Sequence, residues 1–196
     1  MFELRGVIEL VDSKKRLRKK ISAKLNALST EQRAKIDRDL HAQLFQQTEW
    51  KQASTIGVTI SLEHEWDTWT IIEQAWQEHK RVVVPKCNPT DKSMTFYQIE
   101  TKDDLAIQFY NLMEPIETRT IRVNKQAIDL LIVPGVVFDD RHYRIGHGGG
   151  YYDRFLADFS ANTVSLVWQG QMISKIKNEP FDQPVKQLLV SQQSDD

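Results

Sequence analysis

The chain has 196 residues, 40% of them hydrophobic and 27% charged, with a formal net charge of −1 at pH 7. This length can bury ~70% of the unfolded surface, so we expect one soluble domain over residues 1–196 whose core needs no disulfide or metal. The near-neutral charge argues against bulk nucleic-acid binding. The single cysteine and the lack of a long apolar run or a signal-peptide pattern predict a cytoplasmic protein with no membrane partner.

The N-terminal segment combines a helical apolar stripe with a dense basic cluster. Leu17, Ile21 and Leu25 recur at helical spacing. The basic residues of the segment are Lys14, Lys15, Arg16, Arg18, Lys19 and Lys20. Because residues four apart lie on the same side of a helix, Lys14 and Arg18 can point in one direction. The cluster is either a solvated helix face or a set of cations that face phosphate groups.

A second helix is predicted to begin at the capping box of residues 29–32 and to continue to about residue 47. His41 in this helix is predicted to be a surface residue. Residues 55–60 have the pattern of a buried strand, and Asp67 is suited to cap a helix over residues 69–79. Glu65 lies just past the strand, where open α/β sheets place ligand contacts; a carboxylate there can also serve only to complement the helix dipole.

Two further strands are predicted at residues 82–85 and 94–97, with a turn-rich segment between them. Cys87 is interpreted as a small packed hydrophobic residue rather than a nucleophile. Residues 109–115 follow a short helix, and their aromatic and methionine side chains are assigned by default to the core or its cover. The five histidines are scattered without the spacing of a zinc site.

The most informative stretch begins with a buried strand at residues 130–133 and breaks at Pro134 and Gly135. It continues through a glycine-rich loop at residues 144–150 into a helix predicted over residues 151–159. Glycines let a phosphate group approach the backbone, and a helix start offers unpaired N–H groups. Arg144 can clamp a phosphate and Asp153 can hold the magnesium of a nucleotide. The stretch predicts a polyphosphate cradle, although it matches neither the P-loop nor the dinucleotide-binding pattern.

The remaining elements are a buried strand predicted at residues 163–168 and a polar tail at residues 192–196. Strands thus alternate with helices along the chain, and glycine-rich or acidic segments follow the strand ends. This order predicts a single layered α/β domain with a mainly parallel central sheet flanked by helices. The sequence contains no internal repeat and no linker.

Residues 144–154, Arg-Ile-Gly-His-Gly-Gly-Gly-Tyr-Tyr-Asp-Arg, resemble the signature loop of the 5-formyltetrahydrofolate cyclo-ligase (methenyltetrahydrofolate synthetase) family, whose pattern is Arg-Leu-Gly-x-Gly-x-Gly-Tyr-Tyr-Asp. The resemblance covers nearly the whole chain, strongest at residues 134–156 and thinner at residues 87–128. It implies an ATP- and Mg²⁺-dependent ligase that converts 5-formyltetrahydrofolate to 5,10-methenyltetrahydrofolate and releases ADP and phosphate. A monomer and a homodimer are both compatible with it.

The resemblance also implies roles for individual residues. The implied ATP site consists of Lys14, Lys15, Arg16, Leu17, Arg18, Arg144, Ile145, Gly146, His147, Gly148, Gly149, Gly150, Tyr151 and Tyr152. The implied folate site consists of Ile60, Glu65, Tyr110, His147, Gly148, Gly149, Gly150 and Tyr151. Arg144 and Tyr151 would be catalytic, and Asp153 and Asp182 would hold Mg²⁺.

Four positions depart from the pattern of that family. Lys15 stands where arginine is common, and His142 replaces an expected turn glycine. Phe181 replaces the polar residue that usually precedes Asp182, and Lys186 stands where a second aspartate is common.

Among the basic residues of the first helix, we expect Lys14 and Arg18 to contact phosphate and the others to be surface charge. Two other classes of function remain open at this stage. One is a different ATP-dependent enzyme that uses the same loop for another small molecule. The other is a non-catalytic module whose basic helix binds RNA, which would be marked by steeply salt-dependent binding.

Overall fold

The computed structural model describes residues 13–107 and 113–193. The N-terminal part is helical: α1 is Lys14–Ala27, α2 is Thr30–Gln46 and α3 is Thr48–Gln52. The predicted capping box at the start of α2 is confirmed, with Ser29 and Gln32 exchanging side-chain to backbone hydrogen bonds. Further along the chain, α4 is Trp69–Gln77 and the short α5 is Tyr151–Leu156.

In the described part of the chain, the largest sheet has seven strands in the order β12-β10-β7-β1-β2-β3-β6. The strands β12 (Gln187–Ser191), β10 (Asn162–Trp168), β7 (Leu130–Ile132), β1 (Thr55–Gly57) and β2 (Arg81–Cys87) run parallel. The last two, β3 (Met94–Ile99) and β6 (Ile121–Val123), are antiparallel to their neighbours. The predicted mainly parallel sheet is therefore confirmed.

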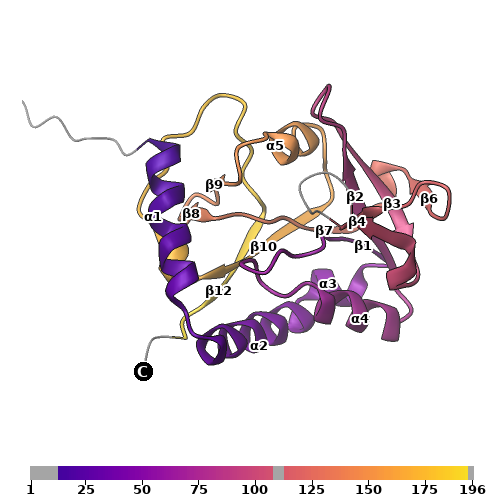
Figure 1. The fold of residues 1–196 in the computed structure, drawn as a ribbon, viewed down its shortest axis with the longest axis horizontal. Helices are drawn as coiled ribbons and strands as arrows, with labels where there is room; N and C mark the ends of the chain where they lie inside the picture. Colours follow the sequence, from indigo (N-terminus) through magenta and orange to yellow (C-terminus); the bar gives the residue numbers. More distant parts are fainter. Residues whose placement is uncertain (1–12, 108–112, 194–196) are drawn as a thin grey trace, which may run out of the picture.

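The two faces of this sheet carry separate hydrophobic clusters, because side chains alternate along a strand. Val82 and Val84 of β2 belong to the larger cluster, together with the buried sides of α1, α2 and α4. Val83 belongs to the other cluster, with Leu131 and Phe155. Figure 1 shows α2, α3 and α4 below the sheet and α5 above it, so the predicted flanking helices are present on both faces.

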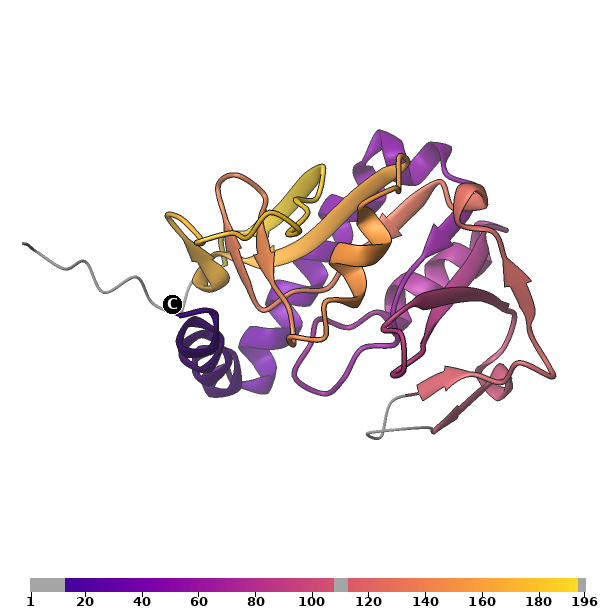
Figure 2. The same cartoon turned by 90° about the horizontal axis from the view of Figure 1, so that it is seen from above.

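Two smaller sheets complete the strands of the described residues. One joins β11 (Met172–Ile173), β8 (Val137–Asp139) and β9 (Arg144–Ile145), and the β8–β9 hairpin leads into the glycine loop. The other pairs β4 (Leu105–Ile107) with β5 (Met113–Pro115), two strands that the sequence did not predict. Figure 2 shows this β4–β5 pair at the opposite end of the molecule from α1. Short 3-10 helices lie at Lys102–Asp104, Lys125–Ala127 and Gln169–Gln171.

The turn of the β8–β9 hairpin forms although His142 stands where the family pattern has glycine. His142 takes a left-handed backbone conformation with φ 65°. The fully buried Asp139 carboxylate accepts hydrogen bonds from the backbone N–H groups of Arg141, Tyr143 and Ile176. These bonds join the β8–β9 hairpin, which leads into the glycine loop, to the segment after β11, which leads into the C-terminal loop. Asp139 therefore stabilises the starting points of both loops.

Several predicted ends differ from the structure. The strand predicted at residues 55–60 ends at Gly57, the helix predicted at 69–79 ends at Gln77, and the helix predicted at 151–159 ends at Leu156. The cap residue of α4 is Thr68, but the Asp67 carboxylate still accepts the backbone N–H of Trp69 at 2.9 Å. Among the described residues, no helix has the length and apolar character needed to cross a membrane.

The prediction that His41 lies on the surface was wrong. Only 6% of His41 is exposed, because it neighbours Leu40 on the side of α2 that packs into the core. Its Nε2 atom lies 2.7 Å from the carbonyl oxygen of Asp67, and its ring stacks against Phe45. The buried histidine therefore ties α2 to the segment before α4.

Candidate active site

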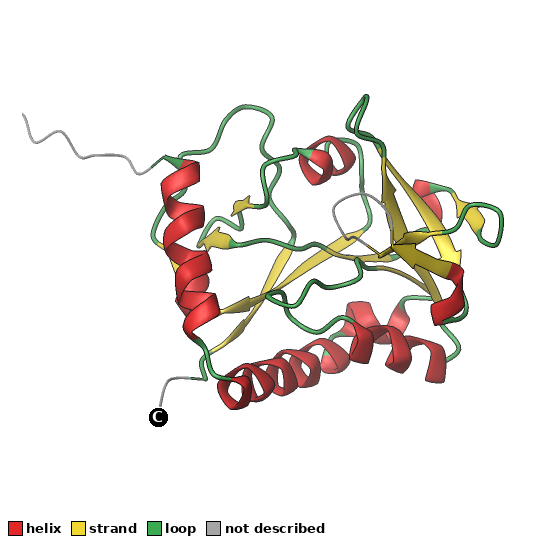
Figure 3. Cartoon of the chain, viewed as in Figure 1, coloured by secondary structure: helices red, strands yellow, loops and turns green. Residues whose placement is uncertain are grey.

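A cavity of about 790 Å³ opens at the carboxyl ends of the parallel strands. Thr59 and Ile60 follow β1, Cys87 ends β2 and Pro134 follows β7, and all of them line the cavity. The other walls are the start of α1, the glycine loop with the start of α5, and the segment of residues 179–183. Figure 3 shows loops gathered between α1 and α5 on this side of the sheet. The site thus lies where the strand-end rule expects it.

Most of the predicted site residues line this one cavity. They are Lys14, Arg18, Ile60, Glu65, Arg144, Ile145, Gly146, His147, Gly148, Gly149, Gly150, Tyr151, Tyr152, Asp153 and Asp182. Lys15 and Arg16 are exposed and Leu17 is buried in the core, and these three do not line it. Tyr110 lies outside the described residues.

The glycine loop needs glycine at two positions. Gly148 and Gly150 have φ values of 101° and 69°, in the left-handed region that side chains disfavour. The Arg18 guanidinium lies against Gly148, and its Nε donates a hydrogen bond to the carbonyl oxygen of Gly146 at 2.7 Å. The loop is therefore held from α1 by one of the two cations that the sequence predicted to contact phosphate.

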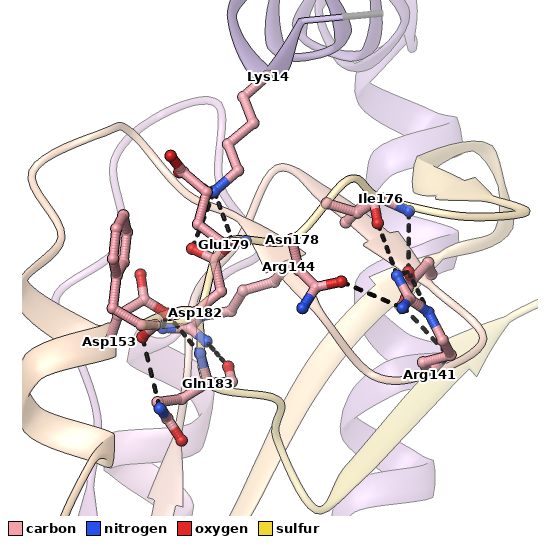
Figure 4. A network of polar contacts seen from close by, with 11 residues as sticks. Lys14, Arg141, Arg144, Asp153, Ile176, Asn178, Glu179, Asp182 and Gln183 are labelled. Carbon is pink, nitrogen blue, oxygen red and sulfur yellow. Dashed lines mark hydrogen bonds and ion pairs between the residues drawn. The ribbon is translucent and has the colours of Figure 1, made fainter. Parts of the chain in front are cut away.

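Arg144 is almost fully buried beneath the loop, with 6% exposed. Its Nη1 donates to the carbonyl oxygen of Gln183 at 2.6 Å, and its Nη2 lies 3.3 Å from Oδ1 of Asp153. Figure 4 shows Arg144, Asp153 and Gln183 in one network. Burial lowers the pKa of Arg144 and the Asp153 carboxylate opposes this shift; a guanidinium stays protonated in either case. The side chain is a fixed positive charge at the cavity wall.

Lys14 reaches from α1 to the C-terminal loop, as Figure 4 shows. Its Nζ lies 2.6 Å from Oδ2 of the buried Asp182 and 2.8 Å from Oε2 of Glu179. Burial alone would lower the pKa of Lys14, but the hydrogen bonds to these two carboxylates outweigh it and raise the pKa. Lys14 and Asp182 are 168 residues apart in the sequence. Their contact therefore joins an N-terminal and a C-terminal segment at the cavity wall.

The two aspartates predicted to hold Mg²⁺ face the same cavity, and each is paired with a cation. Asp153 contacts Arg144 and Asp182 contacts Lys14. In the part of the chain that the structure describes, no group of three or more histidine, cysteine or acidic residues could hold a metal by itself. Mg²⁺ usually takes one or two carboxylates and completes its shell with water and substrate phosphates. Two carboxylates beside the predicted phosphate cradle would fit that habit.

Glu65 joins the loop after β1 to the glycine loop. Its Oε1 lies 3.1 Å from Nε2 of His147, and its Oε2 accepts the backbone N–H of Leu62 at 2.9 Å. Burial would raise the pKa of Glu65, but the hydrogen bonds from His147 and Leu62 outweigh burial and lower the pKa. Glu65 is therefore an ionised acceptor in the cavity at neutral pH.

The sequence missed several residues of the cavity wall. Thr59, Cys87, Met94 and Gln183 line it, and Phe181 was noticed only as a departure from the family pattern. Thr59 and Cys87 could have been found from their position at the carboxyl ends of β1 and β2. Burial, with the Glu114 carboxylate nearby, raises the pKa of Cys87 to about 11. The thiol is thus neutral at pH 7, consistent with its interpretation as a packed residue.

An α/β fold with a glycine loop and fixed cations at the carboxyl ends of its parallel strands is typical of an enzyme that binds anionic small molecules. Residues 11–191 match the sequence profile of the 5-formyltetrahydrofolate cyclo-ligase family. The chain belongs to this family of ligases, as the signature loop predicted. The enzyme interpretation is confirmed, and we set the RNA-binding interpretation aside.

Individual relatives agree with the family assignment. The 5-formyltetrahydrofolate cyclo-ligase of Escherichia coli (strain K12) is 28% identical over 174 residues, which are 86% of this chain and 95% of that protein. The NMR structure of Aquifex aeolicus 5,10-methenyltetrahydrofolate synthetase is 28% identical, with a TM-score of 0.79 over 90% of this chain and 89% of that one. A 5,10-methenyltetrahydrofolate synthetase from Mycoplasma pneumoniae, 23% identical, has the same fold, with a TM-score of 0.73 over 90% of this chain and 98% of that one.

Proposed function

We propose that this protein converts 5-formyltetrahydrofolate and ATP to 5,10-methenyltetrahydrofolate, ADP and phosphate, with Mg²⁺. The observation that carries the proposal is that one cavity is lined by two chemically different sets of residues. The first set is the fixed cations Lys14, Arg18 and Arg144 with the glycine loop, and the second is Glu65 with the apolar Ile60. A triphosphate needs the first set, and a reduced pterin with N–H donors and an apolar face needs the second.

The chemistry accounts for the need to hold both substrates at once. A formamide oxygen is a poor leaving group. Transfer of the γ-phosphoryl group from ATP to that oxygen therefore comes first and converts the formyl group to an activated iminium phosphate. The nitrogen at position 10 of the folate then attacks the activated carbon, the carbon–oxygen bond to phosphate breaks, and the proton lost from that nitrogen passes to the departing phosphate as the ring closes. Both steps demand positioning more than covalent participation by the protein.

Roles for the side chains follow from this scheme. Lys14, Arg18 and Arg144 neutralise phosphate charge together with the loop N–H groups. Asp153 and Asp182 would hold Mg²⁺, which when bound shields the charge of the nucleotide phosphates. These assignments rest on the cavity lining and on the ion pairs described above.

On the folate side, Glu65 accepts hydrogen bonds from the pterin, with Ile60 against its apolar face. Tyr151 packs at the start of α5 where the substrate is held in the reactive shape. Ile145, His147 and Tyr152, which belong to the implied site, also line the cavity. A cytoplasmic location, a monomeric or homodimeric state and the assignment of residues 1–196 to one domain stay predictions of the sequence.

The test is the near-ultraviolet absorbance of the purified protein with 5-formyltetrahydrofolate, with and without Mg·ATP. We expect an ATP-dependent rise from the methenyl product. Tyr151→Ala should fold normally and lose most of this activity, about 100-fold, because the substrate is no longer held in the reactive shape. Absence of a rise from folded wild-type protein would overturn the proposed reaction, and full turnover by Tyr151→Ala would remove Tyr151 from the site.

A further inference from the structure

Among the described residues, the large hydrophobic side chains that remain exposed are Ile107 (71%), Ile121 (68%) and Phe181 (63%). Of these, Phe181 is the one that lines the cavity. Leaving a phenyl ring in water forgoes the stabilisation that burial of an aromatic side chain provides. Packing of the fold therefore does not explain this ring, whereas contact with a ligand at the cavity rim would.

The backbone on both sides of Phe181 is held in place. The backbone N–H of Asp182 donates to the carbonyl oxygen of Glu179 at 3.0 Å, and the N–H of Glu179 donates to Oδ2 of Asp182 at 2.6 Å. The N–H of Gln183 donates to Oδ1 of Asp153 at 3.1 Å. The ring is thus presented at the cavity rim from a fixed turn.

The surroundings of the ring indicate which ligand it meets. The Nζ of Lys14 lies 5.8 Å from the centre of the Phe181 ring, within the range of a cation–π contact. The neighbouring Asp182 and Gln183 contact Lys14 and Arg144, two of the cations to which we assign phosphate groups. Phe181 therefore belongs to the nucleotide side.

We propose that Phe181 stacks against the base of the bound nucleotide and so provides the base-binding surface of the site. The inference rests on the proposed use of ATP. A base offers a flat π-face to an aromatic ring, and such stacking strengthens binding without reading hydrogen-bond donors or acceptors. Phe181 would thus tune nucleotide affinity.

The test is isothermal titration calorimetry of the full chain with ATP and, separately, with inorganic tripolyphosphate, which carries the phosphates without a base. Phe181→Ser should weaken ATP binding about 10-fold and leave tripolyphosphate binding unchanged. Phe181→Trp, which keeps an aromatic face, should retain the wild-type affinity for ATP. Ile121→Ser is the matched control, because it removes an equally exposed apolar side chain outside the cavity lining, and it should change neither affinity.

Other outcomes overturn the inference in distinguishable ways. Unchanged ATP affinity in a Phe181→Ser protein that still turns over folate would refute base stacking and leave the proposed function standing. A parallel loss of ATP and tripolyphosphate binding would show that the ring acts only by holding Lys14. A loss confined to 5-formyltetrahydrofolate would assign the ring to the folate. Failure of the wild-type protein to bind any nucleotide would refute this inference together with the proposed function.

Discussion

Lys14 and Arg144 are held by carboxylates in the same cavity where we expect phosphate groups to bind. Asp182 is 2.6 Å from the Lys14 ammonium, and Asp153 is 3.3 Å from the Arg144 guanidinium. Paired charges cost less to bury than single ones, so these contacts keep the cavity wall charge-balanced. Phosphate oxygens would compete for the cations, and the carboxylates so released would be available to Mg²⁺.

A prediction at the same scale concerns His147→Ala. Because the hydrogen bond from His147 helps to keep the pKa of Glu65 below its ordinary value against the effect of burial, removal of the ring should raise the pKa of Glu65. In the wild type the lowered pKa contributes stability that is present above the unfolded value of about 4.3 and is lost as pH falls through the folded value. In the variant this contribution should shrink.

The measurement is an NMR titration of the Glu65 carboxyl carbon in the wild type and in His147→Ala, together with urea unfolding at pH 7 and pH 4. The stability difference between the two proteins should be larger at pH 7 than at pH 4. An unchanged titration midpoint for Glu65 would show that the backbone N–H of Leu62 alone holds the carboxylate ionised.

At the scale of elements, the glycine loop offers a matched pair of substitutions. A Cβ atom added at Gly149 would lie 2.6 Å from the ring of Tyr151, whereas one added at Gly146 meets no atom within 4 Å. Neither glycine needs a left-handed φ, so the difference between the two lies in the space around them. Gly149→Ala should displace the Tyr151 ring and lower turnover by at least 10-fold, since the ring can move more easily than the backbone.

Gly146→Ala is the control for the position of that ring. The NMR signals of the Tyr151 ring should shift in Gly149→Ala and stay near their wild-type positions in Gly146→Ala. Both variants should keep a free energy of unfolding within about 1 kcal/mol of the wild type, because neither methyl group enters the core. Wild-type ring signals and turnover in Gly149→Ala would contradict the role given to the loop in setting Tyr151.

Elements of the fold could be predicted where a periodic pattern is long. The apolar stripe of α1 and the capping box of α2 are local signals; both helices form, and α2 begins within one residue of the expected position. The end of β1 at Gly57 could not be predicted, because residues 58–60 (Val-Thr-Ile) are typical of a strand, although Val58 is buried in the core and Thr59 and Ile60 line the cavity. The pattern reports burial, and here burial continues beyond the strand.

The sequence predicted which residues belong to the candidate site better than it predicted how those residues contact one another. The strand-end rule and the signature loop indicated Glu65 and Arg144, and both line the cavity. The pairing of Lys14 with Asp182 could not be predicted, since it joins residues 168 apart through the whole topology. The burial of His41 was missed because a histidine near the edge of an apolar stripe has no sequence signal that distinguishes core from surface.

At the scale of the molecule, the cavity joins segments from both ends of the chain. Its wall begins at Lys14 in α1, crosses the ends of the parallel strands and finishes at Gln183. Because the unfolded chain cannot assemble these segments, a ligand of the cavity binds the folded state alone and should stabilise the whole molecule. The increase in the free energy of unfolding should exceed the increase that local ordering of one loop would give.

The corresponding prediction is a rise in Tm when Mg·ATP is added at about 100 times its Kd. Linkage then supplies about 2.7 kcal/mol, and a chain of this size gains roughly 2–4 °C per kcal/mol, so Tm should rise by about 5–10 °C. Differential scanning calorimetry measures the shift, with the ligand concentration varied to confirm that Tm follows its logarithm. Asp182→Asn is expected to give a different shift at the same nucleotide concentration, because it frees Lys14 from its partner in the cavity. A protein that turns over folate with Mg·ATP but shows no dependence of Tm on nucleotide would contradict a binding site built from both ends of the chain.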